Sequence, residues 1–135
     1  MHLACESGAS AAVIKILLEV FPLAVFAKSQ YDMTPIHFAC SRHRDPAVIQ
    51  TLLVDGNLET CRISDTLGRL PLHVALMGFA PYEVIELLVA SAPDSVVAKT
   101  HKGELPLDIA RRKGTCPMVM ELLELVVDKL ALTNN

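Results

Sequence analysis

The strongest constraint on the fold of this chain is a short phrase that returns at an almost constant distance. It reads TPIHFA at 34–39, LPLHVA at 70–75 and LPLDIA at 105–110. His37 and His73 are 36 residues apart, and Asp108 follows His73 after 35. Counting 35 residues back from His37 reaches His2, in MHLA. A period of this length predicts a stack of similar units, each of which buries its apolar surface against its neighbours.

Apolar residues keep matching beyond the phrase itself. Fifteen residues after the landmark His or Asp stand Leu17, Leu52, Leu88 and Leu123. The surrounding segments VIKILL, VIQTLL, VIELLV and VMELLE have apolar residues at helical spacing. Leu52 is therefore expected in the middle of the array, beneath helices of both neighbouring units.

Turn and capping residues divide each unit into two helices. Asp32, Gly68 and Gly103 mark a turn, because Gly and Asp tolerate a positive φ. A first helix then begins at the proline of the phrase, and Thr34 is expected to cap one such helix. We expect this helix to break near Gly8, His43, Phe79 and Gly114. The second helix is expected to begin at or just after Ser10, Asp45-Pro46, Pro81 and Pro117.

These units resemble ankyrin repeats, whose motif is of the T-P-L-H-x-A kind. TPIHFA differs from it only in its Ile, LPLHVA in its first residue, and LPLDIA also in its Asp. The resemblance covers essentially the whole chain and implies one all-α domain over 1–135, a solenoid of helix-turn-helix repeats with short β-hairpin turns. The predicted units are approximately 1–31, which is N-terminally incomplete, 32–66, 67–101, and 102–135, which is the C-terminal cap.

The histidines of the phrase have two interpretations, a chemical site or a structural joint. Identical residues at identical repeat positions favour the joint, and the resemblance implies that such a His bonds to backbone. His37, Cys40 and His43 could form a soft metal-ligand set, but the chain has neither C-x-x-C nor H-E-x-x-H. We therefore expect no metal and no other cofactor.

Cysteine usage and charge indicate where the chain works. Cys5 and Cys40 are equivalent residues of successive units, and helices packed ~8–10 Å apart hold Cα atoms too far apart for a disulfide. Four free thiols indicate an intracellular, most simply cytoplasmic, location and leave the nucleus open. A net charge of -3 and the short run Arg111-Arg112-Lys113 disfavour nucleic acid as a partner. The longest apolar region, 11–27, is interrupted by Lys15, Glu19 and Pro22, which argues against a membrane span.

The sequence predicts a binding module and not an enzyme. It lacks G-x-S-x-G, a Walker loop and G-x-G-x-x-G. Two alternatives stay open: the chain could be the targeting segment of a larger multidomain enzyme, or a purely structural spacer.

The resemblance implies that a partner protein binds on a concave face made by the turn tips and the first helices. The partner-binding residues it implies are Tyr31, Met33, Arg42, Leu67, Arg69, Met77, His101, Lys102, Glu104 and Arg112. The wider face, which also takes in Glu6, Asp32 and Lys113, has five basic and three acidic residues. We therefore expect a mildly acidic partner surface and an association weakened by salt.

The two ends of the array are predicted to differ. In the last unit Glu121, Glu124 and Asp128 fall on one side of the second helix, which is typical of a cap. From Val13 to Phe21, by contrast, only Lys15 and Glu19 are polar. We expect an exposed apolar patch at the N-terminal end, covered either by upstream repeats or by self-association with another chain.

Overall fold

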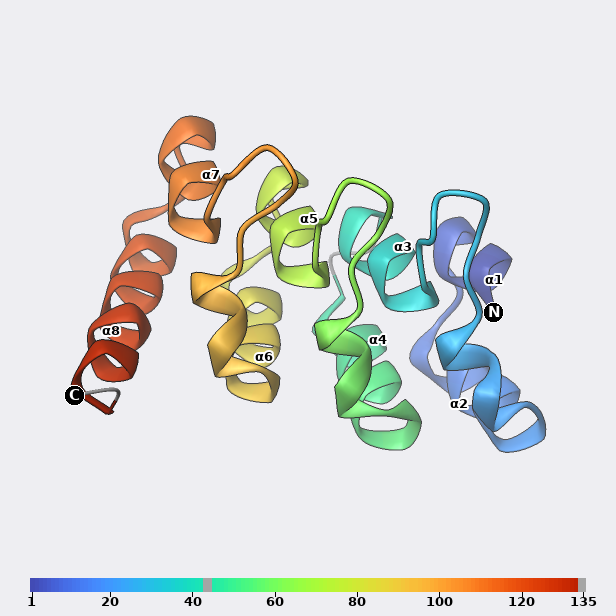
Figure 1. Ribbon diagram of the computed structural model, residues 1–135. Helices are drawn as coiled ribbons and strands as arrows, with labels where there is room; N and C mark the ends of the chain where they lie inside the picture. The colour runs from blue at the N-terminus through green and yellow to red at the C-terminus, as the bar shows by residue number, and fades with distance from the viewer. Residues whose placement is uncertain (43–44, 134–135) are drawn as a thin grey trace.

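The computed structural model describes residues 1–42 and 45–133, in which helices form two rows. The first row contains α1 (His2–Ser7), α3 (Pro35–Arg42), α5 (Pro71–Met77) and α7 (Pro106–Lys113). The second row contains α2 (Ala11–Val20), α4 (Pro46–Thr51), α6 (Tyr82–Ser91) and α8 (Pro117–Thr133). Figure 1 shows the rows one above the other, with the chain ends at opposite ends of the stack. The all-α solenoid is thus confirmed, while the unit boundaries stay a prediction.

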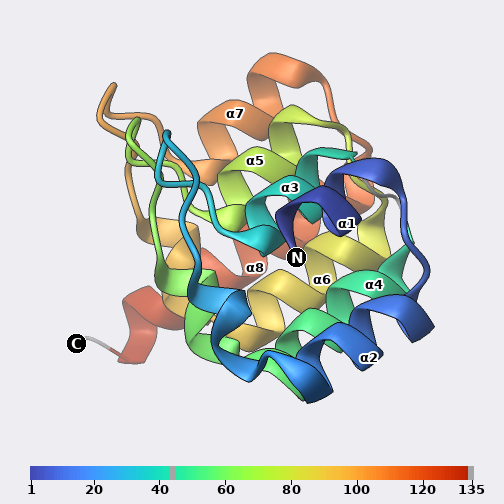
Figure 2. The ribbon, with the colours of Figure 1, turned by 90° about the vertical axis from the view of Figure 1, so that its right-hand side faces the viewer.

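Three turn tips connect successive helix pairs and project on one side of the first row (Figure 2). Asp32, Gly68 and Gly103 have φ values of 58°, 74° and 79°, as the sequence predicts. A Cβ on Gly68 would also collide with the His101 ring of the next tip. Backbone hydrogen bonds close each tip, but the structure assigns no strand within the residues that it describes. The predicted β-hairpins are therefore tight turns.

Three of the first helices, α3, α5 and α7, begin at the prolines of the repeated phrase, whereas α1 begins at His2. The N–H of Leu70 donates to Nδ1 of His73, and the N–H of Leu105 donates to Oδ2 of Asp108. The landmark side chain thus satisfies a backbone donor at the start of each of these three helices. The predicted Thr34 cap has a different form, because the Thr34 hydroxyl hydrogen-bonds the His37 ring at 2.9 Å.

The second helices begin where their capping residues predict. Ser10 accepts from the N–H of Val13, and Asp45 accepts from the N–H of Ala47. Of the expected breaks after the first helices, Gly8, Phe79 and Gly114 all have positive φ, and His43 lies outside the described residues.

A short 3-10 helix follows each of the first three second helices, and the sequence analysis missed it. These segments are η1 (Pro22–Phe26), η3 (Leu58–Arg62) and η4 (Pro93–Val97). The available sequence signal was a proline or asparagine within two residues of the end of the second helix. Each one turns the chain back toward the next tip.

The longer spacing between His37 and His73 has a structural cause. The segment η2 (Leu52–Gly56) is a π-turn, in which Asn57 N–H donates to the Leu52 carbonyl five residues back. The equivalent bonds at Leu17 and Leu88 span four residues. The second unit therefore accommodates its one extra residue inside the second helix.

The core lies between the two rows and is almost entirely aliphatic. Ile14, Ile49 and Ile85 of successive second helices are buried, and so is Leu52 at 1% exposure. The expected burial of Leu52 is confirmed.

Candidate functional site

The candidate site is the surface formed by the turn tips 30–33, 66–69 and 101–104 and by the exposed residues of the first helices, here called the turn face. Neighbouring tips hydrogen-bond to one another: Thr66 N–H donates to the Tyr31 carbonyl, and His101 N–H donates to the Leu67 carbonyl, both at 3.0 Å. These bonds make the tips a continuous surface.

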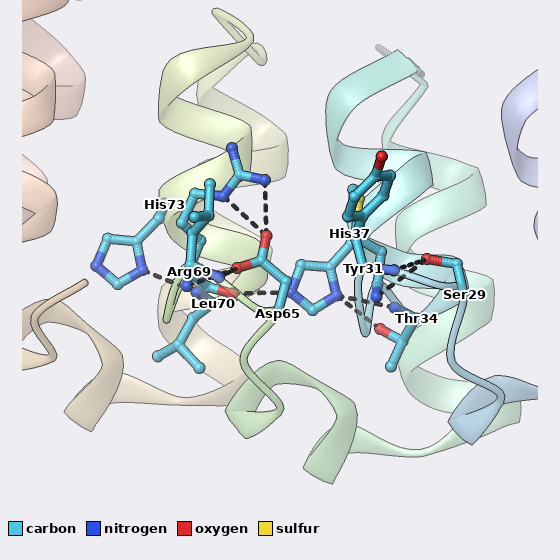
Figure 3. Close-up of polar contacts among 10 residues, drawn as sticks. Ser29, Tyr31, Thr34, His37, Asp65, Arg69, Leu70 and His73 are labelled. Carbon is cyan, nitrogen blue, oxygen red and sulfur yellow. Dashed lines mark hydrogen bonds and ion pairs between the residues drawn. The ribbon is translucent and has the colours of Figure 1, made fainter. Parts of the chain in front are cut away.

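Histidines attach the first helices α1, α3 and α5 to backbone carbonyls later in the chain, and Figure 3 shows this bond for His37. Nε2 of His37 donates to the Arg69 carbonyl at 2.9 Å, and its Nδ1 accepts from the N–H of Thr34 at 3.1 Å. Nε2 of His73 donates to the Ala98 carbonyl at 3.0 Å. His2 makes the corresponding contact with the Met33 carbonyl at 2.9 Å. The interpretation of these residues as structural joints is confirmed.

The hydrogen bonds fix the protonation state of His37 and His73. Each ring donates through Nε2 and accepts through Nδ1, so each is the neutral Nε2–H tautomer. Burial lowers the pKa of both residues from 6.5, although the bonds to the Arg69 and Ala98 carbonyls act in the opposite direction. A neutral ring with both nitrogens occupied is suited to neither metal binding nor catalysis.

The other two members of the metal set that the sequence raised are Cys40 and His43. Cys40 is fully buried, and His43 lies outside the described residues. Over 1–42 and 45–133, the structure brings together no group of three or more His, Cys, Asp or Glu side chains suited to a metal ion. Cys5, Cys40 and Cys61 are buried free thiols, and Cys116 is an exposed one.

Each tip is held by one side chain that the sequence analysis missed. Oδ1 of Asp65 accepts from the N–H groups of Leu67 and Arg69, both at 2.9 Å. Ser29 and Thr100 accept from the corresponding N–H groups of the first and last tips. All three residues stand eight positions before the landmark His or Asp. Extending the repeat comparison into the turns would have found them.

Arg69 belongs to the fold more than to the binding surface. Its Nε and Nη2 both donate to Oδ2 of Asp65 at 2.8 Å, and the Asp65 side chain is fully buried (Figure 3). Reversing the charge of Arg69 is therefore expected to disturb the array. Reversal would place two negative charges together, one of them away from water.

Six of the ten predicted partner-binding residues lie around one hollow on the turn face. The hollow has a volume of about 80 Å³ and is lined by Leu67, Arg69, Met77, Thr100, His101, Lys102 and Glu104. Leu67, His101 and Lys102 are exposed, whereas Arg69, Met77 and Glu104 are half-buried. The structure thus brings together residues of two neighbouring tips and of α5.

The other four predicted residues do not line this hollow. Tyr31 is exposed and Met33 half-buried in the first tip. Arg42 lies 4.0 Å from Glu6, and Arg112 lies 3.1 Å from Glu104. Each of these ion pairs joins two residues of the turn face and lowers its effective positive charge.

An exposed aromatic residue lies next to this surface, at a position that the sequence analysis gave only as the break after a first helix. Phe79, in the turn after α5, has a φ of 55°, and Nζ of Lys113 lies 5.8 Å from the centre of its ring. Gly8 and Gly114 occupy the same position in the first and last units, both with positive φ. An aromatic residue at a position that favours glycine is the sequence signal by which Phe79 could have been recognised as a surface feature.

No helix in the described part of the chain is long and apolar enough to cross a membrane.

Comparisons with known proteins agree with the geometry. A family model described as "Ankyrin repeats (3 copies)" matches residues 1–100. The human protein named "Neurogenic locus notch homolog protein 4" is 35% identical over 95 residues, which is 70% of this chain. The matched region is only 4% of that relative's length.

Proposed function

The chain belongs to the ankyrin repeat family, and we propose that it binds a partner protein through its turn face. Ankyrin repeats are generally non-catalytic protein–protein interaction modules. The observation that carries the proposal is the hollow of about 80 Å³ around six of the ten residues selected from the sequence. This is roughly half the volume of a cavity of about 150 Å³ that holds a benzene molecule. It therefore suits one small aliphatic side chain of a protein partner.

The partner surface is proposed to be mildly acidic. Lys102 lies at the rim of the hollow and has no ion pair with another described residue. Counting Asp65 with the turn face leaves five basic and four acidic side chains, so the excess positive charge is smaller than the sequence suggested. Charge of this kind accelerates and orients association, and salt weakens it.

Peptides selected without prior bias test whether the turn face is the preferred binding surface. A display library of random peptides is selected against the whole wild-type chain, and each selected clone is then measured on two double variants. The first variant is Leu67→Ala with Lys102→Glu, on the turn face. The control is Leu125→Ala with Lys129→Glu, which makes the same changes on exposed residues of α8.

We expect most clones to bind the turn-face variant on the order of tenfold more weakly and the control normally, because truncation at an interface centre costs at least 1–2 kcal/mol. Selected peptides should be enriched in Asp and Glu and should bind more weakly as salt rises. Clones that respond equally to both variants would refute the turn face as the site. Clones without acidic enrichment would refute the proposed chemistry of the partner.

A further inference from the structure

The N-terminal end of the stack exposes more large apolar side chains than any other described surface. Figure 2 looks onto this end, with α1, α2 and η1 in front. Exposed fractions lie between 59% and 78% for Leu3, Ile16, Val20, Phe21 and Leu23. Beside them lies a hollow of about 580 Å³, whose lining includes Leu17, Pro22 and Ala24. A contiguous apolar surface of this kind marks an interaction site.

The residues on α2 are more apolar than their equivalents in the next unit. Ile16 corresponds to Thr51, and Val20 corresponds to Asp55. Ala12, Ile16 and Val20 follow one another at intervals of four residues and form a stripe along the outer side of the helix. The first unit therefore has Ile and Val where the second unit has polar residues.

Two opposite charges border this stripe. At 100° per residue, Lys15 and Glu19 fall on the same flank of the stripe, and both are exposed. Neither has an ion pair with another described residue. Two copies of α2 packed antiparallel about a two-fold axis near Leu17 would place Lys15 of each copy opposite Glu19 of the other. The same register places Val13 of one copy within one residue of the level of Val20 of the other.

We propose that the N-terminal end of this chain binds a second copy of the chain, in a symmetric dimer whose centre is α2. A two-fold interface uses the same patch twice, so the patch must be complementary to itself. The apolar stripe and its Lys15–Glu19 flank satisfy this condition.

The opposite end of the stack offers a mixed surface, on which Met118 and Leu125 of α8 are exposed among carboxylates. On α8, Glu121, Glu124 and Asp128 are exposed, and Glu124 lies 3.7 Å from Arg111. Head-to-tail stacking would bury carboxylates against Ile16 and Val20, which is costly without partners for these charges. The charge distribution therefore favours a closed dimer over an open chain of copies.

Sedimentation equilibrium of the whole chain tests the dimer. We expect the mass to rise from that of a monomer to that of a dimer with concentration, and no further. The variant Ile16→Thr with Val20→Asp carries the residues of the second unit, which are compatible with the fold, and should be monomeric. The control Val54→Asp, at another exposed position, should remain a dimer. Circular dichroism checks that each variant is folded.

Charge reversal tests the register. Lys15→Glu and Glu19→Lys should each raise the dimer dissociation constant on the order of tenfold, because each creates two like-charge pairs. Combining the two substitutions should restore wild-type affinity. A wild-type chain that remains monomeric, a series of species larger than a dimer, or a double reversal that fails to restore affinity would each overturn the proposal.

Discussion

Two arginine–carboxylate pairs of similar geometry but different burial allow a sharp test of which residues hold the fold. Arg69 donates through Nε and Nη2 to Asp65, and Arg112 donates through the same atoms to Glu104. The side chains of Asp65 and Arg69 are 0% and 25% exposed, whereas those of Glu104 and Arg112 are 30% and 50% exposed. We predict that Arg69→Met destabilises the chain and that Arg112→Met hardly changes it.

The magnitude follows from what each substitution leaves behind. Arg69→Met leaves the buried Asp65 carboxylate with only two backbone N–H donors. Breaking a buried pair costs about 3–5 kcal/mol, and we expect the lower end, about 3 kcal/mol, because water reaches part of Arg69. Removal of the exposed pair at Arg112 should cost about 0–1 kcal/mol. Urea unfolding followed by circular dichroism measures both losses.

A double variant separates a stranded charge from general damage to the tip. Ser29 and Met33 occupy the positions of Asp65 and Arg69 in the first tip, where the Ser29 hydroxyl accepts the same two backbone N–H bonds. Asp65→Ser with Arg69→Met should therefore recover most of the stability, to within about 1 kcal/mol of the wild type. If Arg69→Met costs no more than Arg112→Met, or if the double variant is no more stable than Arg69→Met, the reasoning is refuted.

Three further predictions concern the core, pH and thiols. Leu52→Ala should lower the free energy of unfolding in urea by about 2–5 kcal/mol, because the Leu52 side chain is fully buried. The control Val54→Ala, at an exposed position, should lower it by less than about 0.5 kcal/mol. Equal losses would contradict the placement of the second helices. Burial lowers the pKa of His37 and His73 below 6.5 in the folded state, so the unfolded chain takes up protons first and stability is lost as pH falls below 6.5. The free energy of unfolding should fall by up to about 1.4 kcal/mol per pH unit for each His. Urea midpoints measured at several pH values test this, and a midpoint that stays constant from pH 7 to pH 5 would contradict it. In the native state the exposed Cys116 should react with a thiol reagent long before the other three cysteines. Burial raises the pKa of the Cys5, Cys40 and Cys61 thiols and so suppresses the reactive thiolate. Simultaneous reaction of all four would show that the core opens readily.

The helices could be predicted from the sequence because their signals are local and repeated four times. A proline at a helix start or a Gly at a turn imposes the same backbone wherever it occurs. Burial of Leu52 follows as well, because the same offset is apolar in every unit.

The burial and ion pairing of individual side chains could not be predicted in this way. Arg69 looks like a surface residue in the sequence, and only the fold shows that Asp65, four residues earlier, lies beneath it with no exposure. The total charge of the turn face was overestimated for this reason. Repeat comparison finds what the units share, whereas the Asp65–Arg69 pair occurs in one tip alone.

The position of the extra residue in the second unit explains why the turn face stays regular. The bond from Thr66 N–H to the Tyr31 carbonyl and the bond from His101 N–H to the Leu67 carbonyl join the same repeat positions, although the first spans the longer unit. An insertion within a tip would shift one of these bonds by a residue and separate neighbouring tips. The π-turn at Leu52–Gly56 places the insertion in the second row of helices instead, away from the tips. The second row can therefore vary in length while the row of tips, on which a partner would bind, keeps its register.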